Sequence, residues 1–499
     1  MFAAVLGLAC SGTGGTDTTQ GESDGCTPGS ENCPCLEGGV CEAGLLCASN
    51  VCTPAVDPTT STSTGDATSG TDTSSTTGTT GLIGECMPAD GSENAVCSGL
   101  DPAAPYCSKK GECVPCTGLG ACPNDAPACN ATSGLCVECR PGDAVACSGN
   151  TPVCDDASSS CVACSAHDQC PESACDLFTG ACFPTSSVYW VNQNDPNCKP
   201  DLGTEDDPFC TIADAMTAAA GGKSAVIKIF QGVYTGPVVV PSGLTLAILN
   251  VDIAGKGKVG LKGGNESLLQ AQSGAKLLLD GLTISGNANG NGMVSTNAAV
   301  WFDRCEIGDS AKAGLSATVS DLRVHRTLIA NNGLVGIDVS GGSLSLVNTF
   351  VTINGKIGKG GGISAHDTAT LKLLYTTVIA NEAAAGFAPN IVCDEGQGWD
   401  VTVRNSAIIA KGGDSLNCVA NVTTSAVDGM VTGDGNFLID FDTLPTYFAA
   451  QGGIYSAKAQ TALATVGRWL EGDPATDFDG DLRPTQDGAP DFAGADRVP

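Results

Sequence analysis

The sequence is poor in basic residues, in histidine and in aromatic side chains. Lys and Arg number 23 against 54 Asp and Glu, so the net charge is −31 and the pI is near 4.1. Nucleic acids and anionic membranes repel such a chain, and we expect neither as a general partner. No apolar run approaches the ~20 residues of a spanning helix, so we expect any membrane attachment to come from a lipid.

Histidine occurs only at His167, His325 and His366, whereas cysteine occurs 28 times, mostly at regular spacings. This balance favours disulfides in an oxidising, extracytoplasmic compartment over a set of zinc sites. Six cysteines fall in Cys26–Cys52, which is too short to bury a core of its own. Sixteen more fall in Cys86–Cys182, in four sets of four joined by CVPC, CVEC and CVAC.

The four sets resemble small cysteine-rich repeats of the Dickkopf-like or EGF-like kind, which implies a row of stapled modules. Two other readings of the CxxC pairs stay open, namely zinc binding and redox chemistry. The connectivity within each set is not determined by the spacing. As a whole, the row is expected to act as a semi-rigid spacer, with a protein-binding array as the alternative.

Six segments between Lys276 and Ala410 repeat one apolar pattern: LLLDGLTISGN, VWFDRCEIGDS, LRVHRTLIANN, LSLVNTFVTIN, LKLLYTTVIAN and VTVRNSAIIAK. Apolar residues occupy the first and third positions and again the eighth. The eighth positions are 22 to 30 residues apart along the chain, and they are Ile284, Ile307, Ile329, Val351, Val378 and Ile408. This period indicates stacked units, and the alternation within a unit indicates strands with every second side chain inward.

The fold class predicted is all-β, a stack of β-coils. The chain resembles the right-handed parallel β-helix (pectin-lyase-like) families, and Gly360–Ile363 (GGGI) resembles the Gly-rich repeats of bacterial surface proteins in that group. The inward position at the turn is occupied, coil by coil, by Leu282, Cys305, Thr327, Thr349, Thr376 and Ser406. The hydroxyls of the threonines and the serine should form hydrogen bonds along the stack. Four coils also carry Asn three residues after the eighth position, which we expect to form tight, left-handed corners.

Met1–Ala9 is short and apolar and ends in small residues before Cys10, which resembles the cleavage box of bacterial lipoproteins, although Gly7 departs from that pattern. The resemblance implies lipidation of Cys10. An ordinary signal peptide is the alternative. Pro54–Gly81 is almost entirely Ser, Thr, Gly and Asp, and is predicted to be a disordered tether.

The predicted domains are a signal and tether (1–25), a six-cysteine knob (26–53), a linker (54–82), four Cys-rich repeats (83–186), the β-helix with an N-terminal capping helix (187–475) and a C-terminal cap (476–499). Thr211 can cap a helix over Ile212–Ala220 that covers the first coil. The predicted bridges are Cys198–Cys210 and Cys393–Cys418. Cys305 is then left as a buried, inert thiol.

The last segment, DFDGDLRPTQDGAPDFAGADRVP, resembles the closing motif of several bacterial β-helix surface proteins and is predicted to cap the far end of the stack. Asp477, Asp479 and Asp481 offer oxygen ligands for Ca²⁺. A turn held by Arg483 and backbone amides is the alternative, and no other cofactor is expected.

Aligning the coils puts basic and aromatic side chains on one outward face, next to an acidic one. The candidate ligand-binding residues are Trp301, Asp303, Arg304, Arg323, His325, Arg326 and Tyr375. Aromatic stacking and Arg contacts of this kind suit a sugar chain. No set of acids or bases typical of a lyase or hydrolase is evident, and a merely solvated face remains an alternative.

The sequence therefore predicts an exported, monomeric surface lipoprotein whose β-helix binds a polysaccharide or another surface component without catalysis. A polysaccharide lyase or glycoside hydrolase is the first alternative, and a structural spacer is the second.

Overall fold

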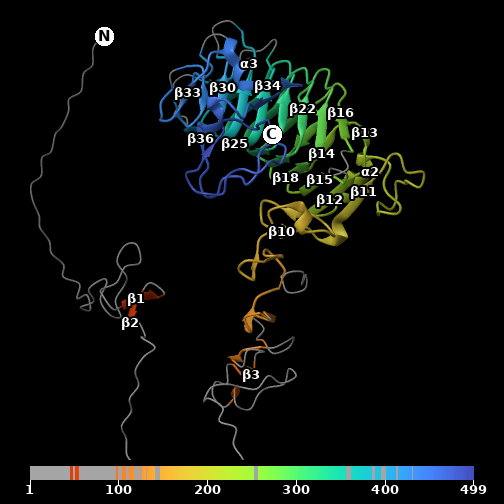
Figure 1. Ribbon diagram of the computed structural model, residues 1–499. Helices are drawn as coiled ribbons and strands as arrows, with labels where there is room; N and C mark the ends of the chain where they lie inside the picture. The colour runs from red at the N-terminus through yellow and green to blue at the C-terminus, as the bar shows by residue number, and fades with distance from the viewer. Residues whose placement is uncertain are drawn as a thin grey trace, which may run out of the picture. The chain divides into compact units, whose positions relative to one another are not determined.

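The computed structural model describes residues 147–498 apart from 252–256, 356–360, 385–387, 395–399, 412–413 and 430, together with short stretches between 45 and 140 (Figure 1). The chain divides into two units, 1–81 and 82–499. In the first, strands β1 (Leu45–Ala48) and β2 (Val51–Pro54) form an antiparallel hairpin. Cys10 and nearly all of the predicted linker lie outside the described residues. No helix in the described part of the chain is long and apolar enough to cross a membrane.

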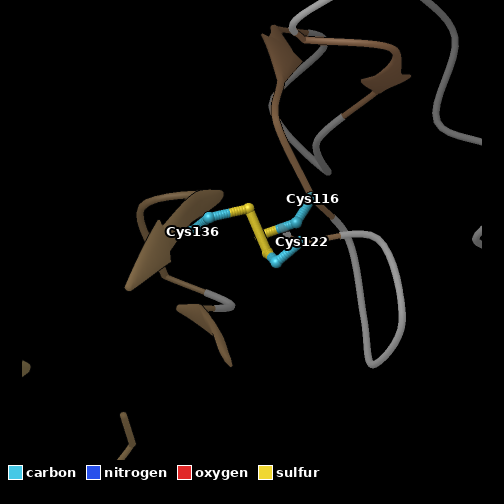
Figure 2. Close-up of side chains that lie close together, drawn as sticks. All are labelled: Cys116, Cys122 and Cys136. Atoms are coloured by element: carbon cyan, nitrogen blue, oxygen red, sulfur yellow. A yellow bond between two sulfur atoms is a disulfide. The ribbon is translucent and has the colours of Figure 1, made fainter. Parts of the chain in front are cut away.

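The Cys-rich repeats are hairpins stapled by disulfides. In the second to fourth repeats the first cysteine pairs with the third and the second with the fourth. The bridges are Cys116–Cys129, Cys122–Cys136, Cys139–Cys154, Cys147–Cys161, Cys164–Cys175 and Cys170–Cys182. Figure 2 shows the sulfur–sulfur bond of Cys122 and Cys136 beside Cys116. Because these thiols are bonded to each other, the zinc reading is wrong for these three repeats.

Each repeat contains one short hairpin. Each of its two strands contains one cysteine, and these two cysteines belong to different bridges. The strands are β3 (Tyr106–Cys107), β4 (Cys113–Val114), β5 (Ala128–Asn130), β6 (Leu135–Val137), β7 (Val153–Asp155), β8 (Ser160–Val162), β9 (Cys175–Asp176) and β10 (Ala181–Cys182). The fourth repeat also has a 3₁₀ turn, η1 (His167–Gln169), and η2 (Thr185–Ser187) leads into the next domain.

The rest of the chain winds as a parallel β-helix, as predicted, with three strand positions in each coil (Figure 1). The first face contains β11 (Val188–Val191), β12 (Ser224–Ile229), β15 (Thr245–Asn250), β18 (Lys276–Asp280), β21 (Ala299–Asp303), parts of β23 (Ala313–His325), β25 (Val335–Thr352) and β27 (Thr370–Ile379), β29 (Asp400–Arg404) and β31 (Ala420–Thr423).

The second face contains β13 (Gly232–Thr235), β16 (Val259–Lys262), β19 (Leu282–Ser285), β22 (Glu306–Gly308), β24 (Leu328–Ala330), the ends of β25 and β27, β30 (Ala407–Ile409), β32 (Ala426–Val427) and β33 (Phe437–Leu438). The third face contains β14 (Val238–Val240), β17 (Leu269–Ala271), β20 (Met293–Thr296), the starts of β23 and β25, β26 (Ile363–His366) and β28 (Ile391–Cys393).

The predicted internal file on the second face is confirmed. Register pairs join each of its six members to the next, from Ile284 to Ile408. All six side chains are at most 1% exposed. Burying an aliphatic side chain of this size contributes about 1.5–3 kcal/mol, so the file is a main source of the stability of the stack.

The stacked hydroxyls bond between coils, as predicted. Thr327 Oγ1 accepts from the Cys305 amide at 3.3 Å, and Ser406 Oγ accepts from the Thr376 amide at 3.0 Å. Thr349 Oγ1 donates to the Val324 carbonyl at 3.0 Å. Cys305 is free and buried, and burial raises the pKa of its thiol, so it is inert.

The asparagines at the corner have a different role from the one predicted. The left-handed residue is the one before each of them, as at Asn331 (φ 67°) and Ile353 (φ 59°). The asparagine itself points inward: Asn354 Nδ2 donates to the Ile329 carbonyl at 2.9 Å and to Asn381 Oδ1 at 3.1 Å. Asn354 Oδ1 accepts from the amide and side chain of Asn332, at 3.1 and 2.9 Å. The amide side chain satisfies backbone groups that the corner leaves unpaired.

The N-terminal end of the stack is covered by α2 (Ile212–Ala219), as predicted. Thr211 Oγ1 accepts from the Asp214 amide at 3.2 Å, which caps the helix. Ile212, Ala215 and Ala219 are buried against the first coils. Both predicted bridges are present, Cys198–Cys210 beside this helix and Cys393–Cys418 between long turns.

The C-terminal part differs from the prediction, because parallel pairing ends at Leu438 and the chain then folds back along the side of the stack. This closing segment consists of η3 (Phe441–Thr443), α3 (Leu444–Tyr447), the hairpin β34 (Phe448–Gln451) and β35 (Ile454–Ala457), η4 (Ala462–Thr465), and the pair β36 (Gly467–Arg468) and β37 (Pro490–Asp491).

The closing segment binds the coils themselves, not the end of the stack. The Ala495 amide donates to Thr377 Oγ1 at 2.9 Å, and Asn348 Nδ2 donates to the Thr476 carbonyl at 2.7 Å. Ala495 packs with Leu328 and Phe350, which face outward from the second sheet and are 7% and 0% exposed. Outward apolar side chains need a cover, and this segment supplies it.

Replacing Asn354 with Ala should remove the four hydrogen bonds of its side chain, among them those to the Ile329 carbonyl and from the Asn332 amide inside the stack. We expect a loss of about 3 kcal/mol in the free energy of unfolding, measured by urea or thermal unfolding. Asn421→Ala, at an exposed position of β31, is the matched control and should change stability little. Equal stability of the two variants would contradict a structural role for the asparagine row.

Candidate functional site

The corner between the first and second faces positions a row of side chains. In six successive coils, from β18 to β29, the residue that follows the first-face strand is left-handed: Gly281 (φ 71°), Arg304 (52°), Arg326 (42°), Asn348 (48°), Tyr375 (47°) and Asn405 (53°). This backbone turn repeats from coil to coil, so the six positions form a column along the helix. The candidate ligand-binding residues on and beside this column have three different surroundings.

Two arginines of the column form ion pairs with the coil before them. Arg304 Nε donates to Asp280 Oδ1 at 2.8 Å, and Arg326 Nε donates to Asp303 Oδ1 at 2.8 Å. In each pair Nη2 contacts the second carboxylate oxygen, so the contact is bidentate. Asp280 is buried, and burial raises the pKa of its carboxyl while Arg304 opposes that rise. The pairs fix both guanidinium planes.

Trp301 and Arg323 contact the fourth Cys-rich repeat. The ring of Phe178 meets Trp301 edge-on, with centroids 6.0 Å apart, and the Arg323 guanidinium lies 5.5 Å from the centroid of Phe178. Lys276 Nζ also lies over Phe178, at 5.6 Å. Trp301 and Arg323 of the predicted patch therefore belong to a contact within the chain. They do not form an open sugar-binding platform.

His325 is neutral. Its ring lies 4.9 Å from that of Trp301, and burial, opposed by Asp303 and aided by Arg326 and Arg323, lowers the pKa of His325 to about 4. A histidine in this state is not protonated near pH 7. Asp303 forms its ion pair with Arg326, and the ring of His325 packs against Trp301.

The inclusion of Tyr375 in an exposed patch is also wrong, because the closing segment buries it completely. The Arg483 guanidinium lies 3.6 Å from the centroid of the Tyr375 ring and 4.3 Å from that of Phe492. Arg483 also pairs with Asp491 at 3.0 Å with both side chains buried. Tyr375 is therefore part of the core under the cover.

A groove of about 910 Å³ lies between the remaining part of the column and the closing segment. Its helix side contains Arg304 and Arg326 with Lys258, and its other wall contains Gln451 from β34 and Ser456 from β35. The charged lining residues are Lys258, Arg304, Glu306, Arg326, Asp479, Asp496 and Arg497. The sequence reasoning found the two arginines but not the groove, because the second wall comes from residues more than a hundred positions away.

Three aspartates meet at one wall of this groove. Carboxylate oxygens of Asp477, Asp479 and Asp496 lie within 4.8 Å of one another. Asp481, which the sequence placed with Asp477 and Asp479, contributes its amide instead, and this donates to Asp477 Oδ1 at 2.8 Å. The oxygen-only set fits a hard cation such as Ca²⁺.

A separate polar cluster lies on the third face, around His366. Its Nδ1 is 3.0 Å from Asp394 Oδ2, and its Nε2 is 3.0 Å from Asp338 Oδ1 and 3.1 Å from Ser364 Oγ. Burial lowers the pKa of His366, but the bond to Asp394 and the charge of Asp338 outweigh it, so the pKa is raised. An imidazolium between two carboxylates ties neighbouring coils together and is a poor general base.

Replacing Phe178 with Ala should loosen the fourth repeat from the first face. We expect the Trp301 ring to gain solvent contact, which shifts the intrinsic tryptophan emission to longer wavelength and speeds proteolysis between Cys164 and Ser187. Leu135→Ala, at an exposed position of the second repeat, is the control. Unchanged emission and cleavage in the Phe178 variant would contradict docking of this repeat.

A proton NMR titration of the three histidines should separate their environments. His325 should remain neutral down to about pH 4, while His366 should keep its proton above the ordinary value of about 6.5. The cluster of His366 thus contributes its full stability below about pH 6.5 and loses it as the pH rises through the raised pKa. Asp394→Asn should lower the pKa of His366 alone. A His325 that titrates near 6.5 would contradict the buried contact.

Residues 86–188 match a family described as a family of unknown function (DUF8331), which covers the Cys-rich repeats. No curated protein sequence matches the chain. Among solved structures, the chain is similar to one described as a rhamnogalacturonan lyase (12% identity, 60% of this chain and 96% of that one, TM-score 0.30) and to the pectate lyase Pel9A (13%, 62% and 96%, 0.29). A pectin methylesterase from Aspergillus niger is also similar (13%, 52% and 81%, 0.27). None of these similarities bears on activity.

Proposed function

We propose that the chain binds a polysaccharide in the groove between the β-helix and the closing segment, without catalysis, at a cell surface. The observation that carries this proposal is the groove of about 910 Å³ with two arginines held in fixed orientation along it. Ligand sites in proteins commonly measure about 300–1,000 Å³, so the groove is large enough for several sugar units.

The chemistry of the groove suits sugar hydroxyls. Arg304 and Arg326 each use the N–H of Nε and one N–H of Nη2 on their aspartates, so the two N–H groups of Nη1 and the second one of Nη2 can serve a ligand. Glu306 and the Gln451 carbonyl offer acceptors on the two walls. Because the groove is lined by both donors and acceptors and both arginines are paired with aspartates, a hydroxyl-rich polymer fits better than a strongly charged one.

The surface location rests on the cysteines. Disulfides in the repeats and in the β-helix support an oxidising, extracytoplasmic compartment. In this proposal a lipid on Cys10 anchors the chain, and the tether and repeats hold the β-helix away from the membrane. The same arrangement suits a purely structural spacer, and the groove is the feature that a spacer does not require.

A glycoside hydrolase is the second candidate, and one observation favours it. Asp496 and Asp479 lie together at the groove wall, and burial raises the pKa of Asp496 to about 6, with a further rise from Asp479. A protonated carboxyl beside a carboxylate is the pairing that such enzymes use.

The purified full-length chain should bind to one class within a panel of immobilised glucans, uronic-acid polymers and amino-sugar polymers. Replacing both Lys258 and Gln451 with Ala should weaken that binding by about tenfold, since each of them faces the groove and neither holds the fold. Lys312→Ala, an exposed lysine away from the groove, is the control and should bind like the parent chain.

Release of reducing ends or of unsaturated sugars from the bound polymer, lost in Asp496→Asn, would support the hydrolase or lyase over simple binding. Absence of binding to every polymer would contradict the proposal and leave the spacer. Equal weakening by Lys312→Ala would show that general surface charge, and not the groove, is responsible.

A further inference from the structure

The aspartates at the groove wall are arranged as ligands around a common point. Asp477 and Asp479 lie in a turn in which the Asp477 amide donates to the Asp481 carbonyl at 2.9 Å. Asp496 comes from the last residues of the chain, whose backbone pairs with β35 through the Ala457 amide at 2.8 Å. Two distant parts of the closing segment therefore bring carboxylate oxygens to within 4.8 Å of one another.

One of these oxygens has no partner. Asp496 is only 4% exposed, and its Oδ1 is buried without a hydrogen-bond partner. Asp477 is only 1% exposed. A buried carboxylate oxygen without a donor costs free energy, and it is stabilised only by a proton or a cation.

Arg483, whose positive charge acts on Asp477, forms its hydrogen bonds with other residues. Arg483 donates from Nη1 to Asp491 at 3.0 Å and from Nη2 to Asn348 at 2.8 Å, and it is stacked between two rings. Among the described residues, no Lys or Arg forms a salt bridge with Asp477, Asp479 or Asp496. Within the described part of the chain, the three clustered carboxylates thus have no salt-bridge partner.

We propose that Asp477, Asp479 and Asp496 bind a Ca²⁺ ion that joins the turn at 477–481 to the C-terminal strand of the closing segment. Oxygen-only ligands select a hard cation, and Ca²⁺ accepts irregular geometry with water in the remaining positions. The exposed side of Asp479 leaves room for those waters. The ion would hold one wall of the groove in place, and the proposal does not depend on what the groove binds.

Protons are the competing occupants of this site. Burial raises the pKa of Asp477 to about 7, with further rises from Asp496 and Asp479 and opposition from Arg483. Burial also raises the pKa of Asp496 to about 6, with opposition from Ser456 and a further rise from Asp479. Since these values exceed the ordinary value of about 4, the fold without a cation loses stability as the pH rises from about 4 to 7. Stabilisation by Ca²⁺ should accordingly be small at pH 5 and large at pH 8.

The test is thermal unfolding of the full-length chain after treatment with EDTA, with and without about 1 mM CaCl₂ or MgCl₂ at pH 5 and pH 8. We expect Ca²⁺ to raise the Tm by about 2 °C or more at pH 8. The rise should disappear in Asp496→Asn and persist in Asp481→Asn, which keeps the amide that contacts Asp477. Equilibrium dialysis of the unmodified chain with radioactive Ca²⁺ gives the stoichiometry without any variant.

Each contrary result has a clear meaning. The same Ca²⁺ response in Asp496→Asn would place the ion elsewhere. Suppose that neither ion changes the Tm of the parent chain and that Asp496→Asn has a higher Tm than the parent chain at pH 8. The carboxyls would then share protons and would not bind a cation, which would contradict the proposal. A response to Mg²⁺ alone would overturn the assignment of Ca²⁺. Polysaccharide binding by a chain that shows no Ca²⁺ response would overturn this proposal and leave the proposed function intact.

Discussion

In-register stacking of parallel coils is the constraint on which the rest of the structure depends. Because each strand pairs with the same strand of the next coil, every position of a coil repeats as a row along the helix. The inward rows are aliphatic or are hydroxyls and asparagines that bond between coils, as Asn332, Asn354 and Asn381 do. The left-handed corner after the first face is repeated in the same way, and this is what aligns Arg304 with Arg326.

Stacking also determines where apolar side chains face outward and have to be buried by another part of the chain. The early coils have polar outward residues on the second face, such as Thr283 and Glu306, whereas later coils have Phe350 and Ile379 there. The closing segment packs on the later coils and extends past them, so that a groove is left beside the two arginines. On the first face the fourth Cys-rich repeat covers Trp301 in the same manner. The groove thus exists because the closing segment packs on the later coils and leaves the surface beside Arg304 and Arg326 open.

The stack of coils could be predicted from the sequence, whereas the groove and the residues that line it could not. Alternation and constant spacing predict the file from Ile284 to Ile408 and the helix capped by Thr211, because both depend on neighbouring residues. Contacts such as Ala495 with Thr377 join residues that share no repeating pattern, so the cover, the burial of Tyr375 and the pairing of Asp496 with Asp477 were missed. One signal was present: each later coil has a large apolar residue at its outward seventh or ninth position, namely Leu328, Phe350, Ile379 and Ile409, which indicates that something covers them.

The central claim is that the closing segment is docked on the coils and forms one wall of the groove. Hydrogen–deuterium exchange of the full-length chain tests it most directly. The Gly494 amide donates to the Asn405 carbonyl at 2.9 Å and the Phe478 amide to the Ala495 carbonyl at 3.1 Å. The account predicts that peptides over 476–482 and 490–496 are protected as strongly as those from strands β25 and β27. Exchange of these peptides at the rate of an unstructured chain, with the strands still protected, would contradict it.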